Sequence, residues 1–310
     1  MNPAFSIVFF TTLAGSAQGL VVTLGIAVLT SVPLGADFLL VSLAVAELLM
    51  LLALGCSFLH LGHKMRAWRA VLMWRTSWMS REVIVLPAFI AVVGLWWLVI
   101  ALHASVLPRL LAPVLAILVA LGLWFCTAMI YACLRFVQEW AHPLTVVNYT
   151  AIGLSSGLVL AGALATVGGE PVFAKVLVPW TLTVTVAAGL TRWASLHRNA
   201  ALRPRSTVQS ATGLRSPRVV QKAMGMTGGS FNTREFFHGL DSRSLRHVKW
   251  GFLLFAFGLP VVLLLYLLTG GAPRAWLAAL AMQFAGVVAE RWFFFAEARH
   301  PQNLYYQTVS

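Results

Sequence analysis

The sequence has little charge for its length. Of its 310 residues, only 10% are Asp, Glu, Lys or Arg and only nine are acidic, whereas 60% are apolar. Soluble domains carry about 25% charged and about 45–50% apolar residues. The deficit excludes an ordinary soluble domain and indicates an integral membrane protein.

Apolar stretches of about 20 residues recur along the chain, and each is long enough to cross about 30 Å of hydrocarbon at about 1.5 Å per residue. Lipid offers no hydrogen-bond partner to open backbone groups, so every span should be a helix. We therefore predict an all-α, polytopic membrane protein with eight transmembrane helices. The predicted spans are 5–32, 39–60, 82–103, 108–131, 149–168, 173–190, 251–269 and 275–296.

Cysteine is also scarce. Cys56, Cys126 and Cys133 form no CxxC pair, and the last two lie about 10 Å apart along one helix, too far for a disulfide. Such a set cannot build an iron–sulfur cluster or a zinc site. The histidines fall at or beyond predicted helix ends, so no two are placed to ligate a haem in mid-membrane. We expect no metal, haem or iron–sulfur cluster in this chain.

Basic residues are confined to alternate connections. Five fill the connection 61–81 and ten more lie between Arg198 and Lys249, whereas the other connections hold almost none. This positive-inside pattern predicts that these connections and both termini lie in the cytoplasm. The net charge of +13 then indicates contact with anionic lipid or an acidic partner surface, and not with nucleic acid.

The chain thus divides into three parts. Residues 1–192 hold six predicted helices, 193–250 form a basic cytoplasmic connection, and 251–310 hold two helices and a C-terminal tail. The connection 193–250 contains a polar, basic portion with little apolar periodicity. Two interpretations stay open for it: a flexible solvated loop, or an arm that orders on a partner.

Polar chemistry is concentrated in FLHLGHKMRAWRAVLMWRTSWMSREV, residues 58–83. His60 ends the second predicted helix and Glu82 begins the third, so both side chains return to one membrane face. A His and a carboxylate suit the protonation and deprotonation of a quinone's two oxygens, and Trp68 offers flat apolar surface for such a pocket. The alternative is structural: an interfacial tryptophan belt, basic lipid anchors, and Glu82 as a first-turn acid favoured by the helix dipole.

Glu47 is the clearest charged residue inside a predicted span, where charge is costly and often functional. One hypothesis makes it a proton relay or the acid of a binding cavity. The other makes it a neutral carboxyl that serves packing alone, hydrogen-bonded between helices to a polar residue such as Gln18 or Gln283.

Two motifs in this stretch resemble a known family. HLGHKMRAW at 60–68 and SREV at 80–83 are similar to the HLG-x-x-MRA pattern and following S-x-E of the dimethyl sulfoxide reductase membrane anchors, the DmsC-like proteins. The resemblance implies an eight-helix anchor without haem that binds quinone. It further implies two partners: an iron–sulfur subunit that exchanges electrons with the anchor, and a molybdopterin catalytic subunit.

The resemblance carries over to individual residues of the connection. His60 matches the family's quinone-site histidine, Glu82 its acid at the start of the third helix, and Arg66 its MRA arginine. We add Trp68 and Arg75 on the same connection to the candidate quinone-binding residues.

The last helix resembles the family as well. GVVAERWFF, which contains Glu290 and Arg291, is similar to the family's G-E-x-x-G-R-x-F. Here a glutamate replaces the glycine before the arginine, so Glu290 and Arg291 are further candidates whose roles do not transfer directly.

The predicted orientation bears on the partner. Anchors of respiratory dimethyl sulfoxide reductases hold their partners outside, whereas quinone-linked sulfite dehydrogenases have an inner catalytic subunit, and ARHPQNLYYQ at 298–307 is similar to the tail of that branch. We expect electrons to pass from cytoplasmic sulfite oxidation into ubiquinone or menaquinone. A respiratory dimethyl sulfoxide reductase anchor is the alternative, and a proton-coupled transporter that uses Glu47 is the alternative of another class.

Overall fold

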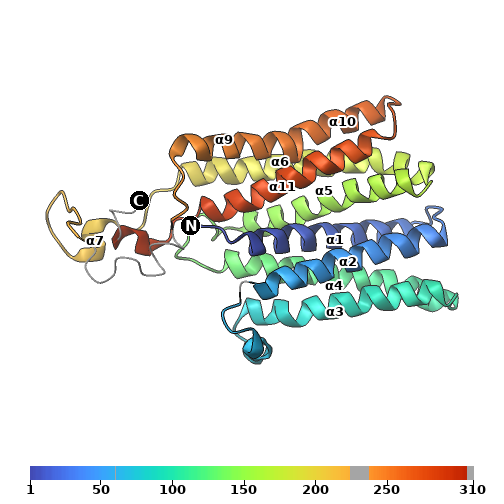
Figure 1. Ribbon diagram of the computed structural model, residues 1–310, viewed down its shortest axis with the longest axis horizontal. Helices are drawn as coiled ribbons and strands as arrows, with labels where there is room; N and C mark the ends of the chain where they lie inside the picture. The colour runs from blue at the N-terminus through green and yellow to red at the C-terminus, as the bar shows by residue number, and fades with distance from the viewer. Residues whose placement is uncertain (60, 224–236, 306–310) are drawn as a thin grey trace.

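The computed structural model describes residues 1–59, 61–223 and 237–305. These residues contain eight helices long and apolar enough to cross a membrane, and no strand. The prediction of an all-α protein with eight spans is confirmed. The spans run along the long axis of the molecule, and the N-terminus, α7 and the turn that follows α11 lie beyond the same end of the bundle (Figure 1).

The eight spans are connected by short segments and by two longer ones. The spans are α1 (Phe5–Leu29), α2 (Ala36–Leu59), α3 (Trp78–Ala101), α4 (Val106–Ala132), α5 (Pro143–Val167), α6 (Pro171–Ala200), a composite helix (Ser242–Leu268) and α11 (Ala275–Ala296). The composite helix consists of α9 (Ser242–Leu253), η3 (Leu254–Gly258) and α10 (Leu259–Leu268). Three short elements lie outside the spans: η1 (Lys64–Met73), α7 (Val208–Thr212) and η4 (Pro301–Tyr305).

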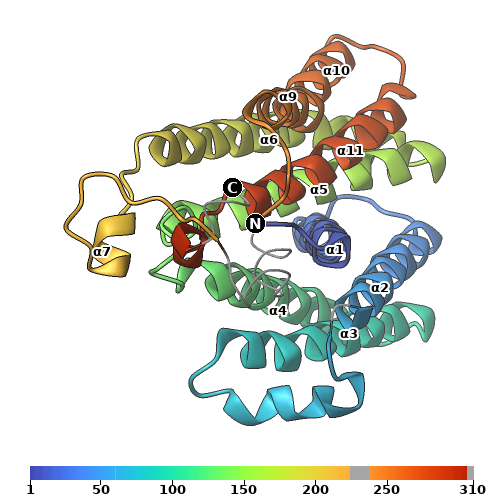
Figure 2. The same ribbon diagram turned by 60° about the vertical axis from the view of Figure 1, so that its left-hand side comes forward.

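The centre of the bundle is formed by α1 and α5, and α1 lies between α2 and α5 (Figure 2). Their most apolar windows are 72% and 67% buried, against 22% for α3. A methyl group on Gly157 of α5 would collide with the backbone of Gly19 of α1, so the two helices can touch only because both positions are glycine.

Several helices extend beyond their predicted ends, among them α5, which begins at Pro143 instead of residue 149. The sixth continues from the predicted residue 190 to Ala200, the seventh begins at Ser242 instead of residue 251, and α3 begins at Trp78 instead of Glu82. Hydropathy reports the segment that contacts lipid, whereas a helix can continue with polar side chains once it is capped. The Asp241 side chain caps α9 by accepting a hydrogen bond from the Ser244 backbone N–H at 3.3 Å.

A π-helical turn interrupts the seventh span over Leu254–Gly258. Pro260 follows it and has no N–H, so the helix cannot make the usual bond to the carbonyl four residues back, that of Ala256. Gln283 of α11 donates a hydrogen bond to this carbonyl at 3.4 Å. The cost of the proline is thus partly offset by a side chain of the neighbouring helix.

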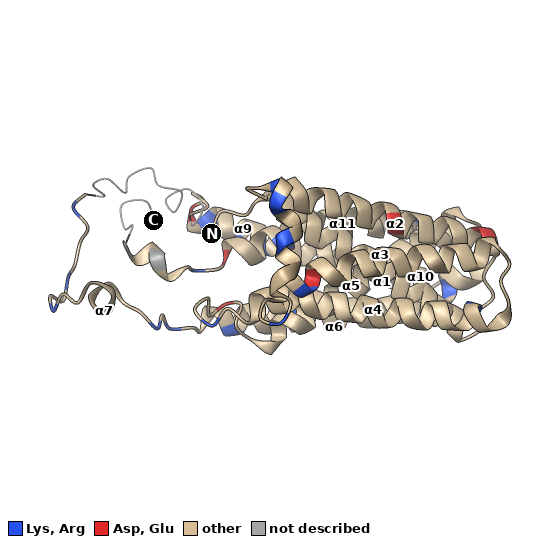
Figure 3. Ribbon diagram, turned by 90° about the horizontal axis from the view of Figure 1, so that it is seen from below, with Lys and Arg blue, Asp and Glu red and all other residues tan. Residues whose placement is uncertain are grey.

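Lys and Arg gather at one end of the bundle, which also carries η1, α7 and the N-terminus (Figure 3). We call this the basic end. Large apolar side chains are exposed along the outer helices, among them Leu48, Leu98, Leu118 and Leu265. Such a surface is costly in water and suits contact with lipid.

Candidate functional site

The connection between α2 and α3 is an exposed basic segment. It contains η1, which buries none of its side chains. Arg66 and Arg75 are exposed, and Trp68 is 63% exposed. His60 lies outside the described residues, so its proposed contact with Glu82 stays a prediction.

Arg81 fixes the end of this connection. Its Nε and Nη2 donate hydrogen bonds to the backbone carbonyls of Trp74 and Arg75 at 2.9 and 2.8 Å. Its guanidinium lies 4.0 Å from the ring centroid of Trp78. One side chain therefore satisfies two carbonyls of the loop and stacks on the first residue of α3, which ties the loop to the helix.

Glu82 lies inside the bundle and not at the loop surface. The Ser77 side chain caps α3 and accepts from the Ser80 backbone N–H at 3.3 Å, so the helix begins before Glu82. The first turn of α3 contains no acidic residue, and the interpretation of Glu82 as a first-turn acid is therefore wrong. Its side chain is 8% exposed and accepts a hydrogen bond from the Thr127 hydroxyl of α4.

Glu290 and Arg291 belong to a buried ion network near the basic end. The Glu290 carboxylate is fully buried and pairs with Arg192 of α6 at 2.6 Å and with its neighbour Arg291. Arg192 and Arg291 are only 2% and 3% exposed. Two buried guanidinium groups thus share one carboxylate, an arrangement that lowers the high cost of taking three charges out of water.

The network reaches toward the basic end through Glu297, which follows α11. Arg192 Nη2 lies 3.8 Å from Glu297 Oε2. Burial raises the pKa of Glu297, and the positive charge of Arg192 opposes this rise. On its other side, the Arg291 guanidinium lies 4.3 Å from the ring centroid of Tyr149, a cation–π contact with α5.

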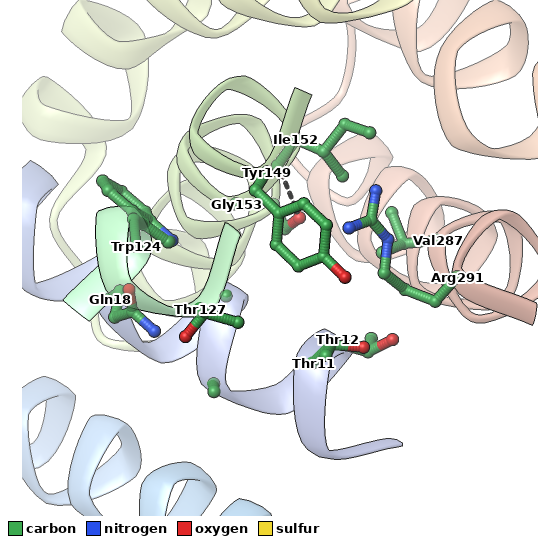
Figure 4. Close-up of a pocket in the computed structure, with 13 residues that line it drawn as sticks. Thr11, Thr12, Gln18, Trp124, Thr127, Tyr149, Ile152, Gly153, Val287 and Arg291 are labelled. Carbon is green, nitrogen blue, oxygen red and sulfur yellow. Dashed lines mark hydrogen bonds between the residues drawn. The ribbon is translucent and has the colours of Figure 1, made fainter. Parts of the chain in front are cut away.

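A small cavity separates Thr127, the partner of Glu82, from Arg291 of the ion network (Figure 4). Its volume of about 20 Å³ is enough for one water molecule. Gln18 Oε1 and Trp124 Nε1 are buried in its wall and have no hydrogen-bond partner among the described residues. The cavity therefore has the size and polarity of a site for a buried water, placed between the two groups of polar residues.

Comparison with known proteins connects this arrangement to a family. A family model described as DMSO reductase anchor subunit (DmsC) matches residues 1–224. The chain belongs to the DmsC anchor family. It is also similar to a subunit of the sulfite dehydrogenase of Allochromatium vinosum (strain ATCC 17899), with 46% identity over 328 aligned positions that cover all of both chains. The resemblance expected from residues 60–68 and 80–83 is confirmed.

The DmsC anchor contains one predicted acid whose environment differs from expectation. Glu47 is half-buried on α2, and its Oε1 lies beside Gly94 of α3. Gln283 does not pair with it, because its Nε2 donates to Ser155 at 2.9 Å and to a carbonyl of the seventh span. The role of Glu47 stays a prediction.

Residues that sequence reasoning missed lie on other helices of this DmsC-family bundle. Thr127 gave no signal, since a threonine in an apolar span is ordinary. Arg192 falls just beyond the predicted end of the sixth span at residue 190, whereas the structure places it buried within α6. The one available signal was complementarity, because a buried acid in the last helix needs a buried cation from another helix.

Proposed function

We propose that this DmsC-family anchor passes electrons from a sulfite-oxidising molybdoenzyme to quinone in the bacterial inner membrane. The observation that carries the proposal is the full-length, 46% identity to a protein named as a sulfite dehydrogenase subunit. In this proposal the direct partner is an iron–sulfur subunit, which receives electrons from a molybdopterin catalytic subunit.

The basic end supports a cytoplasmic location for both termini and for these partners. Lys and Arg gather there (Figure 3), as the positive-inside rule requires of a cytoplasmic face. The exposed side chains of Arg66, Trp68 and Arg75 offer a basic and aromatic surface on which an acidic partner can dock.

The residues beside this surface fit a quinone. A quinone takes up two protons when it is reduced and releases them when it is oxidised. Glu82 is a carboxyl within the second turn of α3, close to the membrane edge, and its Thr127 bond leaves a carboxylate oxygen for further contacts. Thr127 holds the orientation of this carboxyl, which can then accept or donate a proton at a fixed place. His60 adjoins the same connection and is the second candidate proton carrier.

Activity of the complex with two electron acceptors tests this role of Glu82. Glu82→Gln keeps an acceptor for the Thr127 hydroxyl but cannot carry a proton. We expect sulfite oxidation coupled to quinone to fall about 10²- to 10⁴-fold, the usual contribution of a positioned acid–base group. Sulfite oxidation with a soluble artificial acceptor should persist, because it bypasses the membrane. Equal quinone-coupled rates in the variant and the unmodified complex would remove Glu82 from the site.

Two threonine variants provide a matched control. Thr127→Val removes the hydroxyl that orients Glu82 and should lower the quinone-coupled rate while leaving the artificial-acceptor rate unchanged. Thr183→Val removes an exposed hydroxyl on α6 that bonds only to the Pro179 carbonyl and should change neither rate. Assays with dimethyl sulfoxide and reduced quinone on the same membranes test the opposite direction of electron flow.

A further inference from the structure

A groove on the side of the bundle includes neither Glu82 nor Thr127 in its wall, although it shares Thr12, Ser156 and Val287 with the small cavity beside Thr127. The volume of the groove is about 340 Å³, and it is lined by residues of α1, α2, α5 and α11 and by none of α3 or α4. This volume lies in the range of about 300–1,000 Å³ that is usual for small-molecule sites. Apolar side chains form most of the wall, including Leu13, Leu49, Leu160, Leu277 and Phe284.

The groove lies near the middle of the bilayer. Ser156 is thirteen residues from the start of α5 at Pro143, and Gln283 is thirteen residues from the end of α11 at Ala296. At about 1.5 Å per residue, both lie about 20 Å from the basic end of their helices. Leu277 and Phe284 are partly exposed on the outer surface of α11, so the groove is within reach of molecules dissolved in the lipid.

Four polar residues lie in the wall, and every one has its donor group occupied. The hydroxyls of Thr12, Ser16 and Ser156 donate to the backbone carbonyls four residues earlier, at 2.8, 3.0 and 2.5 Å. Gln283 Nε2 donates to Ser155 and to the Ala256 carbonyl. For further hydrogen bonds, this wall therefore offers only the lone pairs of its oxygen atoms, which accept.

One of these oxygens is without a partner. Gln283 is 2% exposed, and its Oε1 has no donor among the described residues. The Ala256 carbonyl, which can only accept, fixes the amide with its nitrogen toward the seventh span. A buried acceptor left in this state is destabilising, and a hydroxyl of a bound molecule can offset this cost.

We propose that this groove binds quinol, the reduced form, in preference to quinone. A quinol carries two hydroxyl donors, whereas a quinone carries only acceptors and cannot pair with a wall of lone pairs. The apolar lining takes the ring and the first part of the isoprenoid chain. This inference rests on the proposed quinone function and adds a second, mid-membrane site, where quinol, the product of quinone reduction, is bound after it leaves the Glu82 region.

Binding of decylubiquinol and decylubiquinone to the full chain in nanodiscs tests the inference, with empty nanodiscs as background. We expect the reduced form to bind about tenfold more tightly, as one buried hydrogen bond provides. Leu277→Trp should fill the groove and abolish this preference. Leu265→Trp is the matched control, because Leu265 is 47% exposed on α10 against 43% for Leu277 and does not line the groove.

Two further variants separate the groove from the Glu82 region. Ser16→Ala combined with Ser156→Ala removes two acceptors without adding volume and should lower the preference for quinol, while Glu82→Gln should retain it. Equal binding of both forms to the unmodified chain, or an unchanged preference in Leu277→Trp, would overturn the groove proposal alone. The quinone-coupled rate of Glu82→Gln tests the proposed function separately, whichever form the groove binds.

Discussion

The α2–α3 connection and the ion network near the ends of α6 and α11 are built from similar residue types but differ in surroundings. Arg66 and Arg75 of the connection are exposed, whereas Arg192 and Arg291 of the network are nearly fully buried. Exposed charges contribute little to stability, since water and salt screen them. Buried charges are costly unless each one keeps its partner. The connection is therefore suited to contacts with other molecules, whereas the network is required for the fold.

The largest expected effect comes from Glu290→Gln. This change leaves the buried Arg192 and Arg291 without their shared carboxylate and should lower the free energy of unfolding by about 3–5 kcal/mol. Titration with a denaturing detergent measures this loss. In the connection, Arg66→Gln should change the same quantity by less than about 0.5 kcal/mol.

A double-variant cycle sharpens this prediction. Arg192→Gln together with Glu290→Gln removes both members of one pair, so the combined loss should be smaller than the sum of the two single losses by at least about 1 kcal/mol. Strictly additive losses would show that the two groups do not depend on each other.

Charge reversal in the connection should affect partner binding and not folding. Arg66→Glu with Arg69→Glu should weaken association with the proposed iron–sulfur subunit about tenfold at low salt. The difference should shrink at about 1 M salt, where the screening length is about 3 Å. The same reversal at Arg109 and Lys175, which are exposed near the starts of α4 and α6 at the opposite end, should leave association unchanged, because that end faces away from the proposed partner.

A smaller, pH-dependent effect is expected at His142, which caps α5 at the basic end. Its Nδ1 accepts from the Leu144 backbone N–H at 3.2 Å, and burial together with Arg198 lowers its pKa from 6.5. A lowered pKa means that the folded state favours the neutral ring. The capping stability, about 1 kcal/mol, is therefore present above pH 6.5 and is lost as the pH falls through the lower folded value.

Asparagine is the matched control at this position. His142→Asn retains an N-cap acceptor that does not titrate, so its unfolding free energy should change less between about pH 8 and about pH 5 than that of the unmodified chain. Identical pH dependence in the two proteins would contradict a role for the neutral ring.

The smallest effect on stability is expected from Trp68→Ala, because this side chain is 63% exposed. We expect a loss below about 0.5 kcal/mol. Trp140→Ala, at the same end but 4% exposed and bonded through Nε1 to the Phe294 carbonyl at 3.0 Å, should cost about 3–5 kcal/mol. Similar losses for the two tryptophans would break the distinction between an exposed connection and a packed interior.

The sequence predicts the spans well, because a helix that crosses lipid needs a minimum number of consecutive apolar residues, which can be counted in the sequence. The last span was predicted at 275–296, and α11 has these bounds. The predicted sixth span ends ten residues too early, since the final turns of α6 carry polar residues such as Arg192 and His197. Those turns remain helical through tertiary contacts, such as the pairing of Arg192 with α11, which no local window can report.

The candidate site was predictable only in part for the same reason. Glu82, Glu290 and Arg291 were identified by their resemblance to family motifs, which are local in sequence. Their partners Thr127 and Arg192 lie on other helices, outside the motifs that carry the resemblance. Predicting these pairs requires knowledge of which helices are neighbours and of how each helix is rotated about its axis. The sequence of an apolar span contains little information on either.

The glycine contact between α1 and α5 also constrains how the chain is made. Gly19 leaves the ribosome 138 residues before Gly157, the residue against which it packs. At about 5–20 residues per second, this interval lasts about 7–28 s. During this interval, α1 must reside in the membrane while α5 does not yet cover its Thr12 and Gln18. Biogenesis of this anchor therefore includes a waiting period in which its central helix lacks its principal partner.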